Sequence, residues 1–191
     1  MKRQEAMETV LHLLTSELVI YCNGMVSREA FTTLDRPESF YMIGSMGLTA
    51  SIGLGVALAR PDRKVLIFDG DGNVLMNLGT LTEVAAFKPT NFFHLCFDNG
   101  VYGSTGNQPT LARVVDLAQV AQSAGYRIVK SVNEKSTLEK TAGQLLQEQG
   151  PIFLLVKVIS EEEYETAGRV TLTPEEIRDR FMATVMARHL V

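Results

Sequence analysis

The sequence of 191 residues has no tryptophan, two cysteines, three histidines and no excess of basic residues. Cys22 and Cys96 are far apart, which argues against a disulfide framework and favours buried thiols in a reducing compartment. His12, His94 and His189 lack metal-like spacing, so we expect packed or solvated imidazoles. The net charge of −4 gives a phosphate backbone or an anionic membrane little electrostatic attraction.

Long apolar runs are also missing. None approaches the roughly 18 residues that a membrane span needs, and polar residues occupy the place of a signal peptide's apolar region. Together these absences predict a cytoplasmic protein that binds neither nucleic acid nor membrane.

Hydrophobic residues make up 46% of the chain, enough for one well-buried domain over residues 1–191, with some apolar surface left to cover a partner. Strand-like and helix-like segments alternate, which predicts an α/β fold with a mostly parallel sheet and helices on both faces. The predicted strands are residues 17–22, 64–68, 91–97, 126–130 and 151–158. The predicted helices are residues 4–14, 27–34, 44–59, 77–87, 115–124, 134–147 and about 174–189.

Three of these segments carry more specific expectations. Ser27 is predicted to cap its helix, and residues 44–59 are almost free of charge and rich in small side chains, which favours a helix buried on all sides. Thr173 and Pro174 have the pattern of a helix start. The acidic run 161–165 before it is expected to be a solvated connection.

A carboxylate between two glycines stands at the end of one predicted strand. Gly70, Asp71 and Gly72 lie where open α/β sheets bind ligands, and glycines there let the backbone approach a phosphate. The acid would repel a phosphate unless a cation lay between them, and Mg²⁺ takes only one or two carboxylates. Asn99 follows the next strand and offers a neutral amide oxygen. Each segment alone is also an ordinary turn, but the pair predicts a metal and diphosphate site.

The Gly70, Asp71, Gly72 triplet, followed after 26 residues by Asn99, resembles the motif of thiamine diphosphate enzymes. The resemblance implies that Mg²⁺ is bound by the side chains of Asp71 and Asn99 and by the carbonyl of Val101. It implies the pyrophosphate-binding domain fold, with a core over about residues 39–158. The cofactor would also contact Gly70, Gly72, Asn73 and Tyr102.

The stretch "GSMG" upstream is similar to the family turn that holds the cofactor's aminopyrimidine. Gly44 would contribute a carbonyl, Ser45 would lie beside it, and the bulky Met46 would wedge between the two rings of the cofactor. Such a wedge would bring the exocyclic amine of the cofactor close to its reactive thiazolium carbon. A proton could then pass between these positioned groups without a diffusive step. Met46 as ordinary core filling remains an alternative.

Within the family, the runs "FYMIGSMGLTASIGLGVALARPDRKVLIFDGDGNVLMNLGTL" and "DNGVYGSTGNQPT" look like sulfopyruvate decarboxylase β subunits and the corresponding half of phosphonopyruvate decarboxylases. Asn107 departs from this pattern, where glycine is expected. The resemblance implies decarboxylation of a 2-oxo acid, with sulfopyruvate giving sulfoacetaldehyde and carbon dioxide, a step that similar proteins use in coenzyme M synthesis. Ser104, Thr105 and Gln108 would border the substrate, unless they form only a solvated turn. Arg169 or a residue of the partner chain is a further candidate for binding the substrate's second anion.

The glutamate that this chemistry needs lies on a separate domain in the family, for which this chain has no room. We therefore expect a partner α subunit with the pyrimidine-binding domain, in an assembly of at least α2β2. Glu83 is expected to lie at the surface without a catalytic role. Two alternatives stay open: a subunit of a 2-oxo acid oxidoreductase, and a regulatory subunit that binds the cofactor without catalysis.

Overall fold

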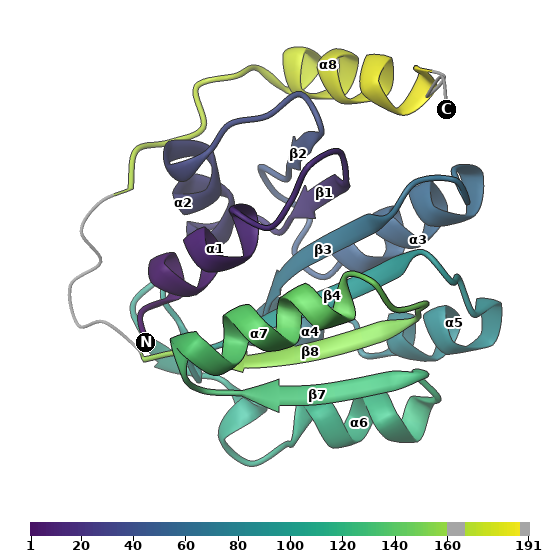
Figure 1. The fold of residues 1–191 in the computed structure, drawn as a ribbon. Coiled ribbons are helices and arrows are strands. Elements are labelled where there is room, and N and C mark those ends of the chain that lie inside the picture. The colour runs from purple at the N-terminus through teal and green to yellow at the C-terminus, as the bar shows by residue number, and fades with distance from the viewer. Residues whose placement is uncertain (160–166, 188–191) are drawn as a thin grey trace.

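The structure is a computed structural model that describes residues 1–159 and 167–187 (Figure 1). Its centre is a six-stranded sheet in the order β2-β1-β3-β4-β8-β7, and every neighbouring pair in it is parallel. The strands are β1 (Leu18–Tyr21), β2 (Ser39–Tyr41), β3 (Val65–Gly70), β4 (Phe92–Asp98), β7 (Ile128–Val132) and β8 (Ile152–Lys157). The predicted parallel α/β sheet is therefore confirmed.

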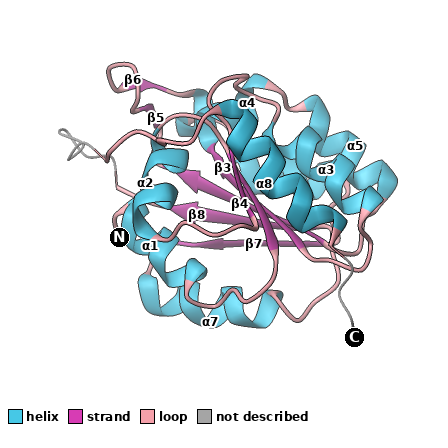
Figure 2. Ribbon diagram, turned by 90° about the horizontal axis from the view of Figure 1, so that it is seen from above, coloured by secondary structure: helices cyan, strands magenta, loops and turns pink. Residues whose placement is uncertain are grey.

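Helices cover both faces of this sheet (Figures 1 and 2). They are α1 (Arg3–Leu11), α2 (Met25–Thr33), α3 (Thr49–Ala59), α4 (Asp71–Met76), α5 (Gly79–Phe87), α6 (Leu117–Ala124), α7 (Lys135–Leu145) and α8 (Pro174–Met186). One buried cluster joins the sheet to α1, α2 and α7, and the other joins it to α3, α5 and α6. Because both faces are buried, the inner strands consist of continuous apolar runs, as the sequence suggested.

The C-terminal helix α8 lies beside the edge strand β2 (Figure 1). Ile177 belongs to one buried cluster and Phe181 to the other, so α8 packs across the end of the sheet. Thr173 caps the helix by accepting a hydrogen bond from the amide of Glu176, as predicted. The helix ends at Met186, and the predicted extension to residue 189 reaches residues outside the described part, as does the acidic run 161–165.

Two helix predictions were wrong in detail. The helix expected from Gly44 begins at Thr49, because the preceding residues form a turn in which Ser45 has a φ of 57° and Gly47 a φ of 93°. This helix is not buried on all sides, since Leu58 is 47% exposed. Ser27 is not a cap: α2 begins at Met25, and the Ser27 hydroxyl donates to the carbonyl of Cys22 at 2.7 Å.

Short elements near the sheet's carboxyl edge were missed. The strands β5 (Val101–Tyr102) and β6 (Gln108–Pro109) form an antiparallel hairpin, and the 3-10 helix η1 (Leu111–Arg113) follows it. The edge strand β2 was also missed, because its three residues are too few to show a period. The hairpin matters because it follows β4 directly and lies over the carboxyl ends of the strands.

Within the described residues, we find no helix that combines the length and the apolar character needed to cross a membrane.

Candidate functional site

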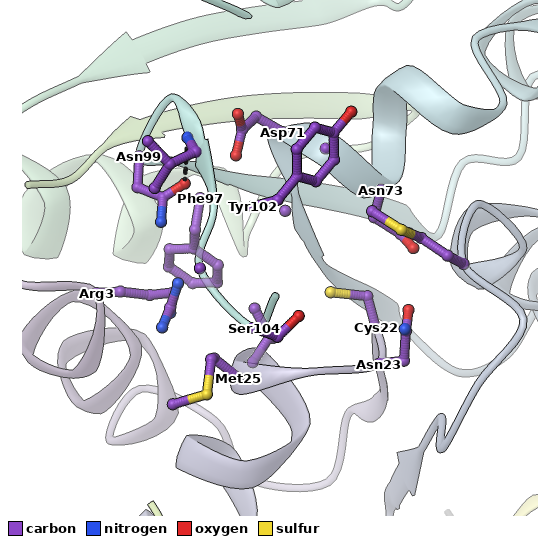
Figure 3. A pocket seen from close by; sticks show the side chains of 16 residues that line it. Arg3, Cys22, Asn23, Met25, Asp71, Asn73, Phe97, Asn99, Tyr102 and Ser104 are labelled. Carbon is purple, nitrogen blue, oxygen red and sulfur yellow. Dashed lines mark hydrogen bonds between the residues drawn. The ribbon is translucent and has the colours of Figure 1, made fainter. Parts of the chain in front are cut away.

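A pocket lies where β1, β3 and β4 end (Figure 3). Its cavity volume is about 70 Å³, well below the roughly 300 Å³ at the lower end of ligand pockets. Nine predicted site residues line it: Met46, Gly70, Asp71, Gly72, Asn73, Asn99, Val101, Tyr102 and Ser104. The other lining residues are Arg3, Cys22, Asn23, Met25, Val26, Phe97 and Gly103.

Asp71 is the first residue of α4 and follows the end of β3 directly. The residue is only 2% exposed, and its Oδ2 accepts a hydrogen bond from the hydroxyl of Thr110. Burial raises the pKa of the Asp71 carboxyl, and the nearby Asp98 carboxylate raises it further, while the Thr110 hydroxyl lowers it in part. A divalent cation would offset both unfavourable effects, because it supplies the missing positive charge.

Asn99 stands at the end of β4, the strand next to β3. Figure 3 shows the Asp71 and Asn99 side chains on the same side of the pocket. The amide of Val101 donates to Oδ1 of Asn99 at 3.1 Å, which fixes this side chain in a turn. The neighbouring Asp98 is buried and forms an ion pair with Lys157 of β8.

These oxygen atoms suit Mg²⁺ better than a transition metal. Within the described residues, no three His, Cys, Asp or Glu side chains gather into a metal-binding group. A site with one carboxylate therefore depends on amide and carbonyl oxygens and on oxygens that a ligand brings, which is the set that Mg²⁺ prefers. The donor set at Asp71, Asn99 and Val101 fits this description.

Gly72 is enclosed by two predicted cofactor residues. A Cβ atom at this position would overlap the ring carbons of Tyr102 and lie 3.4 Å from Cε of Met46. Only glycine therefore leaves room for the Tyr102 ring above α4. Met46 is 37% exposed, so its side chain is available at the rim rather than sealed in the core.

The Asn73 side chain joins the two loops of the site. Its Oδ1 accepts from the amide of Gly47 at 2.7 Å, and its Nδ2 donates to Oγ1 of Thr49 at 2.9 Å and to Asp69. The amide group thus fixes the "GSMG" turn to the start of α4. Its predicted contact with a diphosphate stays a prediction.

Asp69 is a buried acid that sequence reasoning missed. Besides Asn73, its carboxylate accepts from the amide of Gly70 at 3.0 Å and lies 3.2 Å from Nε2 of His94. Nδ1 of His94 is 3.3 Å from the hydroxyl of Tyr126. The histidine is packed, as expected, but it belongs to a polar chain that ends at the site. Asp69 could have been found from its place two residues before Asp71, whereas Thr110 gave no signal because only the hairpin places it.

Some predicted residues do not reach this pocket. Gly44 and Ser45 line a separate cavity beside Pro174 and Ile177. Thr105 and Gln108 are exposed, and the Thr105 hydroxyl donates to Oε1 of Gln108 at 2.9 Å, which matches the solvated turn more closely than a substrate contact. Cys22 lines the pocket as a buried thiol, and burial raises its pKa and that of Cys96 well above the usual range.

Comparisons with known proteins agree with this geometry. Residues 22–156 match the family model of the thiamine pyrophosphate enzyme, C-terminal TPP binding domain. The chain is 40% identical to the sulfopyruvate decarboxylase subunit beta of Methanothermobacter thermautotrophicus over 185 residues, which cover 97% of this chain and 96% of that protein. It is 44% identical to the phosphonopyruvate decarboxylase of Streptomyces viridochromogenes over 167 residues, which cover 87% of this chain and 42% of that protein. The chain therefore spans less than half the length of the second relative.

A crystal structure of a candidate thiamin diphosphate-dependent enzyme from Mycobacterium smegmatis shares the fold, with a TM-score of 0.70 at 21% identity. The match covers 84% of this chain and 32% of that one. By its sequence match and its fold, the chain belongs to the thiamine pyrophosphate enzyme family and carries that family's C-terminal TPP binding domain.

Proposed function

We propose that this chain is the β subunit of a thiamine diphosphate- and Mg²⁺-dependent 2-oxo acid decarboxylase, and that its substrate is sulfopyruvate. The observation that carries the proposal is the pair of Asp71 and Asn99, placed by neighbouring strand ends on one side of a pocket. The similarity to a sulfopyruvate decarboxylase subunit beta over nearly the full length of both chains supports it. The buried, unpaired cysteines fit a location in the reducing cytoplasm.

Each part of the site has a distinct role in this proposal. Mg²⁺ is held by the carboxylate of Asp71, the amide oxygen of Asn99 and the carbonyl of Val101. The cofactor, once bound, supplies the electron sink for loss of carbon dioxide. Its diphosphate and rings are held by Met46, Gly70, Gly72, Asn73 and Tyr102 at the pocket and by Gly44 and Ser45 in the turn that adjoins it.

The chain's own side chains prepare this site before any ligand arrives. Thr110 keeps the Asp71 carboxylate in one orientation, and the amide of Val101 does the same for Asn99. Met46 lies against Gly72, where its thioether can separate the cofactor's two rings. Groups that are already oriented bind with less loss of entropy and position the reacting atoms more closely.

A partner chain completes the active site in this proposal. The lining residues of the pocket include no glutamate, which the chemistry of this family needs, and its volume is well below that of a typical ligand pocket. Ile43, Leu48 and Met76 are 65%, 44% and 60% exposed around the "GSMG" turn, and such apolar side chains suit a permanent subunit contact. We therefore propose an α subunit with the pyrimidine-binding domain, in an assembly of at least α2β2. The word "beta" in the relatives' names agrees with a second subunit.

Phosphonopyruvate is the second candidate substrate. The identity to the Streptomyces viridochromogenes phosphonopyruvate decarboxylase is 44%, slightly above the 40% to the sulfopyruvate relative. We rank sulfopyruvate first because relatives named for it are matched both as separate beta subunits and as a longer chain covered to 47%. Ser104 lines the pocket and can donate to either anion.

Reconstitution tests the proposal. The chain is mixed with an α chain of the pyrimidine-domain type, thiamine diphosphate and Mg²⁺, and aldehyde release from sulfopyruvate, phosphonopyruvate and pyruvate is measured. We expect turnover that Asp71→Ala abolishes and that Asp179→Ala leaves unchanged, because Asp179 is 67% exposed on α8. Absence of turnover on every 2-oxo acid, or an Asp71→Ala pair as active as the wild type, would contradict the proposal.

A further inference from the structure

Two arginines differ from all the others in the described part of the chain. Within residues 1–159 and 167–187, no hydrogen bond, ion pair or other electrostatic interaction joins the side chain of Arg28 or Arg169 to another residue. Every other arginine in that part of the chain donates to a carboxylate or to a backbone carbonyl. Arg28 and Arg169 thus carry guanidinium groups with donors to spare.

These two arginines line the same pocket although they are far apart in the sequence. Arg28 lies on α2 and Arg169 on the segment that leads into α8, which runs beside α2 (Figure 1). A Cβ atom on Gly168 would lie 3.8 Å from Cγ2 of Thr32, so the segment is held against the helix. The pocket has a volume of about 130 Å³, and its other lining residues are Gly24, Ser27, Met42, Ile43 and Val170.

None of these lining residues is an acid. The acid next to Arg28 in the sequence, Glu29, is buried and already paired with Arg3 through two hydrogen bonds. Two like charges that share a pocket repel one another when no acid lines it, as here among the described residues, and a bound anion removes this cost. Guanidinium groups also bind sulfonates and phosphonates well, because their planar forks donate to two oxygens at once.

The pocket adjoins the candidate active site through two chain segments. Gly24 follows Asn23, which lines the active-site pocket, and a Cβ atom on Gly24 would lie 3.3 Å from Oγ of Ser104. Met42 and Ile43 lead directly into the "GSMG" turn. The arginine pocket therefore lies just beyond the residues that border the predicted substrate position.

We propose that Arg28 and Arg169 bind the tetrahedral oxyanion at the far end of the substrate, a sulfonate or a phosphonate. This assignment rests on the proposed function, because it names the group by which a decarboxylase of this kind distinguishes its substrate from pyruvate. The two guanidinium groups supply the charge, and Ser104 lies between this pocket and the metal site.

The binding step can be tested on the full chain without catalysis. Methylphosphonate and methanesulfonate are titrated into the labelled protein while the arginine Nε–Hε signals are followed by NMR, with acetate as a control for charge alone. We expect saturable shifts at Arg28 and Arg169 that weaken about 10- to 100-fold in Arg28→Gln and in Arg169→Gln. Arg127→Gln, which removes an exposed positive charge elsewhere, should bind as the wild type does.

Kinetics on the assembled pair test the link to the substrate. Arg28→Gln should raise the KM for sulfopyruvate or phosphonopyruvate about 10-fold or more with little change in kcat, while the KM for pyruvate stays constant. Arg28→Lys should restore part of the affinity, because it keeps the charge but loses the fork. Inorganic phosphate and sulfate, tested as inhibitors, show whether a free oxyanion competes for the same pocket.

Three results would overturn the proposal. They are shifts that do not saturate, binding that survives Arg28→Gln, and an equal change in KM for pyruvate and for the dianionic substrate. Loss of α subunit binding in Arg28→Gln, with unchanged substrate preference, would assign the arginines to the subunit contact instead. If the wild-type pair has no activity, the proposed function fails, and the titration still decides whether the oxyanion site exists.

Discussion

Nε2 of His94 lies 3.2 Å from Oδ2 of Asp69 in the interior of the sheet, and the two side chains are only 1% and 2% exposed. The other oxygen of Asp69 accepts from Gly70 and Asn73. The imidazole therefore holds the carboxylate from the core side while the loops hold it from the site side. A buried polar group of this kind stabilises a fold only while all its partners are present.

His94→Leu should lower the free energy of unfolding by about 2 to 4 kcal/mol, because it leaves one oxygen of a buried acid without a partner. Tyr126→Phe removes a hydroxyl 3.3 Å from the same ring and should cost about 1 kcal/mol or less. Urea unfolding of both variants measures the difference. Equal losses would show that the contact of His94 with Asp69 contributes little.

Asp71→Asn should stabilise the chain without ligands while it abolishes Mg²⁺-dependent cofactor binding. The folded state raises the pKa of Asp71 above its ordinary 3.8 through burial and Asp98, so the folded chain binds this proton more tightly than the unfolded chain. The resulting stability is present below the ordinary value and is lost as the pH rises through the raised pKa. Thermal unfolding should therefore show a higher midpoint for the variant at neutral pH.

The same pKa shift predicts how metal binding depends on pH. The metal needs the ionised carboxylate, so the Mg²⁺-dependent affinity for thiamine diphosphate should fall on acidification at a higher pH than an exposed aspartate would cause. Calorimetric titration at a series of pH values tests this. An affinity that stays constant down to the ordinary value of 3.8 would contradict the metal assignment of Asp71.

Thr110→Val should weaken Mg²⁺-dependent cofactor binding about 3- to 10-fold, because the lost hydrogen bond was worth about 1 kcal/mol and oriented Asp71. Loss of this donor also raises the pKa of Asp71 further, so the weakening should grow as the pH falls. Thr110→Ser keeps the hydroxyl and should behave like the wild type. Serine and valine variants of equal affinity would show that the hydroxyl has no influence on the metal ligand.

Two glycines of α3 form a matched pair for stability. A Cβ atom on Gly53 would overlap Cδ1 of Ile67 in β3, whereas a Cβ atom on Gly55 would meet nothing within 4 Å. Gly53→Ala should therefore lower the free energy of unfolding by about 1 to 3 kcal/mol. Gly55→Ala should raise it by about 0.5 to 1 kcal/mol, because alanine favours the helix. If both substitutions changed the free energy of unfolding in the same direction, α3 would be able to shift away from the sheet.

Met46→Ala should reduce kcat of the assembled pair more than cofactor affinity. Met46 is partly exposed at the rim, so its loss removes little buried area, yet it removes the side chain that would shape the cofactor. Calorimetry gives the affinity and steady-state kinetics give kcat. If cofactor affinity fell as much as kcat, Met46 would only contact the cofactor and would not shape its conformation.

The sequence predicted the parallel sheet, and it predicted that Asp71 and Asn99 lie in one pocket, for the same physical reason. Strands buried on both faces are continuous apolar runs, and the residues that follow them must lie at one edge of the sheet, so Asp71 and Asn99 could be brought together without coordinates. Contacts that depend on how separate segments pack together leave no such pattern in the sequence. The bond from Thr110 to Asp71 depends on a hairpin of two-residue strands, and the start of α3 at Thr49 depends on the positive φ of Gly47.

Helix α8 covers a sheet edge through which copies of this chain could otherwise aggregate. The sheet has two lateral edges, and the backbone groups of β2 on its outer side would otherwise offer hydrogen bonds to any extended peptide. Phe181 packs its ring 5.4 Å from that of Phe40, and Arg180 binds Asp35 beside the strand. Helix α8 thus shields a sheet edge prone to aggregation, and this protection depends on packing between segments that are more than a hundred residues apart in the sequence.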